Sequence, residues 1–226
     1  MREAIGRVWR RILWWRFRLF QRRRYDRLVL ERVGERPFLI LPQVFNPTLF
    51  LTSEFMVTAL TPRLVPPGAR VLDMGTGAGV GAVFAAQWAG RVTAVDVNPA
   101  AVRCSPINAL LNEVDDRVDV RLGDLFTAVA GERFDVVLFN PPYLPGAPRD
   151  MLDRAFRGPD VLPRFAAQLD AHLLPGGTLL LLLSSLADEA GALRLFTAQG
   201  FGHEVAARRA LPGERVTLWR LRREPT

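Results

Sequence analysis

A short polar motif follows an apolar run in the middle of the chain. Asn140-Pro141-Pro142-Tyr143 comes directly after residues 134–139, a run rich in β-branched and aromatic residues that predicts a buried strand. Two consecutive prolines cannot continue a strand, so the chain must leave the sheet at this point. The motif is therefore expected at the carboxyl end of a strand, where open α/β sheets bind their ligands.

The residue types of this motif suit the handling of a planar –NH2 group. The Asn140 amide oxygen and the Pro141 carbonyl can both accept hydrogen bonds from one amino group, and proline has no competing N–H donor. The Tyr143 ring can stack on a flat amide or base. A conjugated nitrogen is a poor nucleophile, so holding it in a reactive geometry favours its attack. The predicted catalytic residues are Asn140, Pro141, Pro142 and Tyr143, although a strand followed by a Pro-Pro turn remains the plain alternative for the motif alone.

A glycine-rich turn lies upstream of this motif. Residues 71–81 indicate a strand, then a turn that contains Gly75, Gly77 and Gly79, and then the start of a helix. Glycines there allow positive φ and a close approach of the backbone to a ligand. The spacing from Gly77 to Ala82 also fits dinucleotide folds, so it is weak evidence alone. Asp73, however, would repel a pyrophosphate and can serve an amino group. The expected ligand therefore carries no phosphate.

Two further acids end the next predicted strands. Asp96 can take both hydroxyls of a ribose, and Asp124 can accept from an adenine amino group while Leu125 or Phe126 packs nearby. Each acid alone is most simply a solvated residue of a loop. Three acids at successive strand ends of one sheet, counting Asp73, are much less expected by chance. The predicted cofactor-binding residues are Asp73, Gly75, Thr76, Gly77, Gly79, Asp96, Val97, Asp124, Leu125 and Asn140.

The elements that must position these residues alternate along the chain. Strands are predicted at 70–74, 91–96, 117–122, 134–139, 177–184, 202–209 and 214–222, and helices near 79–89, 99–112, 159–173 and 187–199. This alternation indicates an α/β fold, a mostly parallel sheet with helices on both faces. The last two strands are joined too tightly for a crossover helix, so we expect an antiparallel terminal hairpin.

The composition limits the classes of protein to which this chain can belong. A chain of 226 residues predicts one domain with a short extension, and its single cysteine excludes an internal disulfide framework. One cysteine and two histidines cannot build an ordinary zinc site, so no metal is expected. The absence of an apolar leader predicts a cytoplasmic protein, and we expect a monomer.

The positive charge is concentrated at the start of the chain. Residues 1–36 contain twelve arginines against four acids, whereas residues 37–226 are nearly balanced. The spacing of apolar residues predicts a Trp- and Arg-rich helix to about Val33. We divide the chain into this basic extension, 1–36, and a catalytic domain, 37–226. We favour the interpretation that the extension packs on the domain. Contact of the extension with RNA or the ribosome, and contact with an anionic membrane surface, are the two alternatives.

Residues 37–60 connect the two parts. Three prolines predict an irregular approach, followed by a helix that begins near Thr52 or Ser53 and is capped by Ser53. We expect this segment to lie over the cofactor or over the mouth of the substrate site.

Over roughly residues 40–222 the chain resembles the class I S-adenosylmethionine-dependent methyltransferases. The resemblance is carried by residues 73–79, by Asp96 and Asp124, and by Asn140-Pro141-Pro142-Tyr143. It implies a Rossmann-like seven-stranded sheet with S-adenosylmethionine across the strand ends. The motif is similar to that of enzymes that methylate an amide or exocyclic nitrogen, and residues 44–47, 53–56 and 157–162 resemble segments of the HemK-like release factor glutamine methyltransferases.

Three functions follow as expectations. The first is S-adenosylmethionine-dependent N-methylation of a glutamine amide in a translation factor, because a nearly neutral domain suits a protein substrate. The second is methylation of adenine N6 or guanine N2 in rRNA or tRNA, with the basic extension as a nucleic acid anchor. The third is a non-catalytic module that binds S-adenosylmethionine or RNA. The intact Asn140-Pro141-Pro142-Tyr143 motif argues against this third function.

Overall fold

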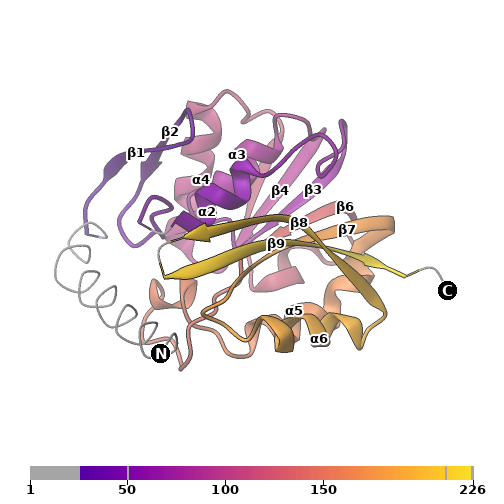
Figure 1. The fold of residues 1–226 in the computed structure, drawn as a ribbon. Coiled ribbons are helices and arrows are strands. Elements are labelled where there is room, and N and C mark those ends of the chain that lie inside the picture. Colours follow the sequence, from indigo (N-terminus) through magenta and orange to yellow (C-terminus); the bar gives the residue numbers. More distant parts are fainter. Residues whose placement is uncertain (1–25, 50, 212, 225–226) are drawn as a thin grey trace.

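The structure is a computed structural model, and it describes residues 26–49, 51–211 and 213–224. Its centre is a seven-stranded sheet with the order β5-β4-β3-β6-β7-β9-β8 (Figure 1). The bounds are β3 Arg70–Met74, β4 Arg91–Asp96, β5 Val118–Leu122, β6 Phe134–Phe139, β7 Leu173–Ser184, β8 Phe201–Leu211 and β9 Glu214–Arg223. All seven predicted strands are confirmed, with ends that differ by a few residues.

The strands from β5 to β7 run parallel, whereas β9 pairs antiparallel with both β7 and β8. The predicted terminal hairpin is therefore confirmed. Its link is too short for a crossover, and Gly213 adopts a φ of 83° that suits a tight turn. The α/β, Rossmann-like architecture expected from the sequence is the one observed.

Helices cover both faces of this sheet (Figure 1). On one face lie α2, α3 and α4, and on the other lie α5 and α6. The bounds are α2 Leu51–Thr58, α3 Val80–Ala85, α4 Pro99–Leu111, α5 Val161–Leu169 and α6 Glu189–Thr197, with short 3-10 helices η3 Leu125–Val129, η4 Asp153–Ala155 and η5 Asp170–His172. The predicted helices are present, but α3 and α5 are shorter than expected because turns or 3-10 segments take their ends.

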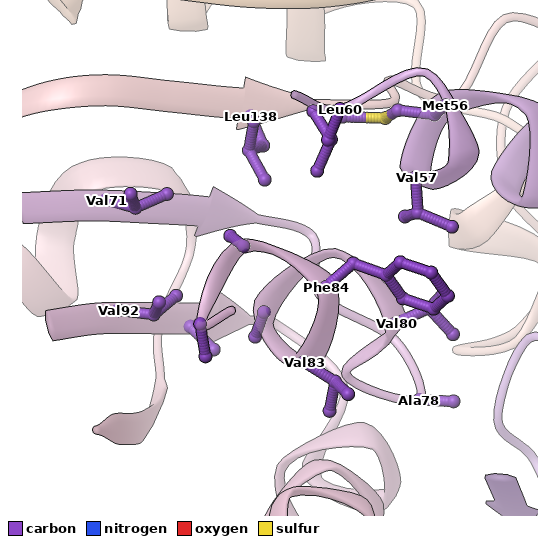
Figure 2. Packing of buried hydrophobic residues seen from close by; sticks show 14 of the residues in the cluster. Met56, Val57, Leu60, Val71, Ala78, Val80, Val83, Phe84, Val92 and Leu138 are labelled. Atoms are coloured by element: carbon purple, nitrogen blue, oxygen red, sulfur yellow. The ribbon is translucent and has the colours of Figure 1, made fainter. Parts of the chain in front are cut away.

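Two apolar clusters hold the layers together. In β6, Val136 and Leu138 face the cluster beneath α3, whereas Phe134 and Phe139 face α5 and α6. A strand buried on both faces needs apolar residues at nearly every position, which explains the apolar run before the motif. Only Asp135 interrupts it, and its Oδ2 accepts a hydrogen bond from Arg70 N at 2.8 Å. Figure 2 shows the Phe84 ring of α3 beside Val57 of α2 and Val80, in the same cluster as Val71, Val92 and Leu138 of the sheet. The motif is thus attached to one of the most buried strands.

The structure corrects the start of the described chain. A helix was predicted to about Val33, but Val29–Val33 forms β1, which pairs antiparallel with β2, Arg36–Ile40. The helical prediction is wrong for these residues, and so is the irregular approach for residues 37–40. Their β-branched and aromatic side chains and the turn at Gly34, with a φ of 54°, favour a hairpin. Residues 26–28 are not helical either, and the rest of the predicted helix falls on residues 1–25, outside the described residues.

The hairpin is fastened to the domain by amide side chains of α4. Asn108 receives a hydrogen bond from Leu39 N at 2.7 Å and donates to Leu39 O at 2.8 Å, and Asn112 donates to Pro37 O at 2.9 Å. The boundary proposed between residues 36 and 37 falls inside this hairpin. Within the described residues, no helix is long and apolar enough to cross a membrane.

Candidate active site

The glycine turn and the polar motif leave the sheet side by side. In the parallel register, Met74 of β3 pairs with Phe139 of β6, so the next residues, Gly75 and Asn140, depart from neighbouring strands at the same level. On the other side of β3, Met74 pairs with Val95 of β4, and Asp96 follows. Residues that are far apart in the sequence therefore share one edge of the sheet, at its carboxyl ends.

The glycine turn presents bare backbone at this edge. Gly75, Gly77 and Gly79 have φ angles of 69°, 56° and 82°, a region that favours glycine. A β-carbon added at Gly77 would meet nothing within 4 Å. A ligand can therefore approach this backbone closely, as the sequence predicted. The Thr76 side chain, in contrast, is buried and donates a hydrogen bond to Asp73 Oδ2 at 2.6 Å.

Asp73 lies beneath the turn rather than in front of it. Its side chain is buried, and Oδ2 also accepts a hydrogen bond from Ala82 N at 2.9 Å. Burial raises the pKa of this carboxyl to about 6, although the bonds from Thr76 and Ala82 lower it. These contacts make Asp73 a brace that joins the end of β3 to α3. Its predicted contact with the amino group of a cofactor stays a prediction.

Asp96 connects the end of β4 to the glycine turn. Its Oδ2 accepts from Gly77 N and its Oδ1 from Asn98 N, each at 2.8 Å. Burial raises the pKa of Asp96, whereas these two bonds lower it. The Val97 backbone also donates to this carboxylate, so three of its roughly four acceptor positions are used. The predicted bidentate contact with a ribose stays a prediction. Val97, the next residue, is half-buried at the same edge.

Asp124 already has a partner. Both of its carboxylate oxygens accept from Arg164 of α5, at 2.7 and 2.8 Å. The next residue, Leu125, has a φ of 52°, which is strained for a leucine and is typical of functional sites. Leu125 and Phe126 are both buried in the core beside Asp124, and their predicted contact with a cofactor stays a prediction.

The acceptor motif is held from two sides. The Asn140 amide group donates to Ser53 Oγ of α2 at 3.5 Å. Pro142 lies against Gly158, where an added β-carbon would come within 3.1 Å of its Cγ. Burial, followed by the negative charge of Glu214, raises the pKa of the Tyr143 phenol, whereas the Thr52 side chain lowers it. Pro141 is buried and the other three motif residues are half-buried, as a partly enclosed acceptor site requires.

The segment before α2 reaches the same edge, as expected. Gln43 O accepts a hydrogen bond from Asn98 Nδ2 at 2.8 Å, which ties the segment to the end of β4. The Phe45 ring lies 5.4 Å from that of Phe156, beyond the motif. The predicted cap is wrong, because α2 begins at Leu51 and Ser53 therefore lies inside its first turn, where it contacts Asn140.

Sequence reasoning missed several residues of this site. Arg164, Thr52 and Glu214 come from elements whose contacts depend on the packing of distant segments, and no spacing in the sequence connects them to the strand ends. Gly158 could have been found, because a glycine just before Pro159 at the start of a helix often marks a close backbone approach.

Comparisons with known proteins agree that this chain is similar to methyltransferases. Residues 36–199 match the model of the methyltransferase small domain. The chain is 33% identical over 192 residues to a putative protein N5-glutamine methyltransferase of Methanocaldococcus jannaschii, covering 80% of this chain and 93% of that one. It is 34% identical over 172 residues to a release factor glutamine methyltransferase of Koribacter versatilis, covering 68% of this chain and 60% of that one.

Solved structures agree with the fold. A 16S rRNA N2 methyltransferase of T. thermophilus, in complex with AdoMet and guanosine, matches with a TM-score of 0.65 at 22% identity, over 88% of this chain and 50% of that one. A structure of the E. cuniculi complex responsible for methylation of a translation termination factor matches with a TM-score of 0.58 at 22% identity, over 80% of this chain and 99% of that chain.

Proposed function

We propose that this chain, which belongs to the methyltransferase small domain family, methylates the side-chain amide nitrogen of a glutamine in a translation release factor. The observation that carries the proposal is the register of β3 and β6, which brings the bare glycine turn and Asn140-Pro141-Pro142-Tyr143 to one edge of the sheet. The names of the relatives from M. jannaschii and K. versatilis support glutamine as the acceptor.

S-adenosylmethionine is the methyl donor in this proposal, and the described residues fit it. The open space at Gly77 admits a ligand against the backbone, Asp96 retains acceptor capacity for ribose hydroxyls, and Leu125 offers an apolar surface. When bound, this cofactor supplies a methyl group on a positively charged sulfur. We assign its binding to the glycine turn, Asp96, Val97, Asp124 and Leu125, with Asp73 and Thr76 bracing the turn.

The motif residues act on the acceptor. The Asn140 amide oxygen and the Pro141 carbonyl accept hydrogen bonds from the two hydrogens of the glutamine –NH2. The Tyr143 ring stacks on the plane of the glutamine amide. These contacts orient the nitrogen lone pair, and most of the rate comes from this positioning. The nitrogen loses a proton only after it is methylated, so the chain needs no general base beforehand.

Methyl transfer into a cell extract tests the proposal. The extract is incubated with the protein and radiolabelled S-adenosylmethionine, and portions are then treated with protease or with ribonuclease. We expect the label to be destroyed by protease and concentrated in a band of release factor size. We expect this reaction in the cytoplasm, with the protein acting as a monomer.

RNA is the second candidate acceptor, and the observation that favours it is the excess of arginine in residues 1–36. Arginines that neutralise phosphates make binding steeply dependent on salt. An enzyme acting on RNA would lose its label to ribonuclease. Removal of residues 1–25, which spares the β1–β2 hairpin, would lower its affinity for RNA and flatten the salt dependence. A protein glutamine methyltransferase would keep its activity on the release factor after that deletion.

A further inference from the structure

The two edges of the β1–β2 hairpin differ. Along β2, Asn108 of α4 accepts a hydrogen bond from Leu39 N at 2.7 Å and donates to Leu39 O at 2.8 Å, so its amide takes the place of a peptide group of a third strand. Figure 1 shows β1 on the outer side of the hairpin, with β2 between it and the helices. Among the described residues, no side chain closes the edge of β1 in the same way.

The ladder shows which backbone groups point to this outer edge. Leu30 pairs with Leu39, whose N–H and C=O both point away from β1 toward Asn108. In an antiparallel ladder both residues of such a pair direct their backbone groups away from each other, so those of Leu30 point outward. Leu28, two residues earlier, has the same phase. In the part of the chain that the structure describes, no hydrogen bond joins the backbone of Leu28 or Leu30 to another residue.

The side chains of the same phase are apolar and exposed. Leu28 and Leu30 are 56% and 67% exposed, whereas Val33, which has the opposite phase, is fully buried. A strand edge with unpaired backbone groups and exposed apolar side chains is a template for pairing with another strand. Addition of a strand would satisfy the backbone groups and cover the leucines. The edge of β1 is therefore an interaction surface, and its sequence indicates the partner.

The segment of residues 26–32, Asp-Arg-Leu-Val-Leu-Glu-Arg, is complementary to itself in the antiparallel direction. Two copies can be paired about Val29 as the centre. The facing pairs are then Val29 with Val29, Leu28 with Leu30, Arg27 with Glu31, and Asp26 with Arg32. Every charge thus faces an opposite charge and every apolar residue faces an apolar one. Cross-strand pairs of both kinds stabilise a sheet.

Other registers lack this match. Facing residues must have the same phase, so the centre of a two-fold pairing falls on a residue. A centre at Leu28 would place Arg27 opposite Val29, and a centre at Leu30 would place Glu31 opposite Val29. A centre at Glu31 would set two carboxylates opposite each other, which destabilises a sheet. The register about Val29 also uses the outward backbone groups of Leu28 and Leu30, the ones that the hairpin leaves unpaired.

The charged residues at the ends of the segment have partners that leave them accessible. Gln43 Nε2 donates to Asp26 Oδ1 at 3.2 Å in an exposed contact. The Arg32 side chain is 65% exposed and lies 3.7 Å from a carboxylate oxygen of Glu35, which is itself at the surface. Exposed contacts of this kind contribute little to stability. Pairing between two copies can therefore compete with them.

We propose that two copies of this chain associate through the edges of β1, about a two-fold axis at Val29, so that their hairpins form one four-stranded sheet. A two-fold interface must be complementary to itself, as residues 26–32 are. Residues 26–28 precede β1 and join the paired strand. Each copy keeps its own glycine turn and acceptor motif, so the single chain remains the catalytic unit. The association goes beyond the proposed function and does not depend on it.

Sedimentation of the full chain tests the association. We expect the mass to rise from 25.3 kDa toward twice that value through the micromolar range, because the interface is small. Leu30→Arg should weaken the dimer at least about tenfold, since it sets a charge opposite Leu28 twice in the two-fold pair. Leu110→Arg is the matched control, because Leu110 is 64% exposed but lies on α4, and it should associate like the wild type.

Two results of this experiment would overturn the inference. A wild type that stays monomeric up to about 1 mM would show that the edge of β1 takes another occupant. A dimer that Leu30→Arg leaves as tight as before would place the contact elsewhere on the chain.

Charge reversal tests the register itself. Asp26→Arg and Arg32→Glu each set like charges opposite each other twice in a homodimer, so each variant alone should associate more weakly than the wild type. In a mixed dimer the two introduced charges face each other with opposite sign, and so do the two native ones. Titration of one fluorescently labelled variant with the other should give a mixed dimer at least about tenfold tighter than either homodimer. A loss of folding cannot produce this gain, and equal affinities for all three pairs would overturn the register.

Discussion

The Asp96 carboxylate accepts a hydrogen bond from the backbone N–H of Gly77, with 2.8 Å between Oδ2 and N. This bond ties the end of β4 to the turn that follows β3, and a second bond from Asn98 N fixes the other oxygen. These bonds within the protein therefore hold the turn and the acid in one arrangement. A site organised in advance loses less entropy on binding, which favours affinity for the cofactor.

The space at Gly77 gives the first prediction. Gly77→Ala places a methyl group where the structure has nothing within 4 Å, and its positive φ should cost about 1 kcal/mol of unfolding free energy. We expect binding of S-adenosylmethionine to weaken about a hundredfold or more, because the methyl group occupies the room of the ligand. Isothermal titration calorimetry measures this loss.

Gly68→Ala is the matched control for that substitution. Gly68 also has a positive φ, 78°, and open space around an added β-carbon, but it precedes β3 at the opposite end of the strand. It should show the same loss of stability with an unchanged Kd. Equal Kd values for the Gly77 and Gly68 variants would show that no ligand approaches the turn.

The buried carboxyl of Asp73 predicts a pH dependence of stability. Its pKa is raised from 3.8 to about 6, so between these values the folded protein binds more protons at this group than the unfolded chain. The contribution is fully present below 3.8 and is lost as the pH rises through 6, a change of at most about 3 kcal/mol. Urea unfolding at pH 4 and pH 7 measures it.

Asp73→Asn serves as the reference, because it removes this titration while retaining an acceptor for Thr76 and Ala82. The wild type should gain stability relative to Asp73→Asn when the pH is lowered from 7 to 4. A difference between the two proteins that is independent of pH would show that Asp73 titrates normally.

The contact between Gly158 and Pro142 gives a third prediction. An added β-carbon at Gly158 would lie 2.6 Å from Val161 Cγ2 and 3.1 Å from Pro142 Cγ, so one of them must move. We expect Gly158→Ala to cost about 1 to 3 kcal/mol of stability and to lower kcat at least about tenfold, with little change in cofactor affinity. Pro159→Ala, at an exposed neighbouring residue, should leave kcat unchanged. A fully active Gly158→Ala enzyme would argue against a rigid motif.

The ion pair of Asp124 and Arg164 gives a fourth prediction. Both side chains are close to half exposed, and such pairs contribute roughly 0 to 1 kcal/mol. Arg164→Ala should therefore change stability by less than about 1 kcal/mol and should not weaken cofactor binding, whereas Asp124→Ala should weaken it about tenfold or more. Weaker binding in Arg164→Ala than in Asp124→Ala would assign the contact with the cofactor to the arginine.

The sequence predicted the sheet well because its signals are local. Largely apolar runs such as residues 134–139, interrupted only by Asp135, indicate strands buried on both faces, and the short link before Glu214 allows only a hairpin. The acids at the strand ends were found for the same reason, since Asp96 is the last residue of β4 and Asp124 lies two residues beyond the end of β5. Parallel strands then bring such residues to one edge whatever their separation along the chain.

The sequence-based predictions were wrong where tertiary contacts determine the local structure. An apolar pattern with period 3.6 was extended to about Val33, but pairing with β2 and the Asn108 and Asn112 bonds to β2 stabilise a hairpin there. Likewise, a serine near a helix start suggests a cap, whereas Ser53 contacts Asn140. The pairing of Asp124 with Arg164 could not be predicted, because it depends on how distant segments pack.

The most direct test of the central claim is tandem mass spectrometry of purified release factor after incubation with the protein and S-adenosylmethionine. The wild type should add one methyl group to a glutamine side-chain amide. Asn140→Ala should lose at least about a hundredfold in rate while its Kd for S-adenosylmethionine stays within a few-fold. A release factor left unmodified by the wild type, or one modified equally fast by Asn140→Ala, would contradict the account.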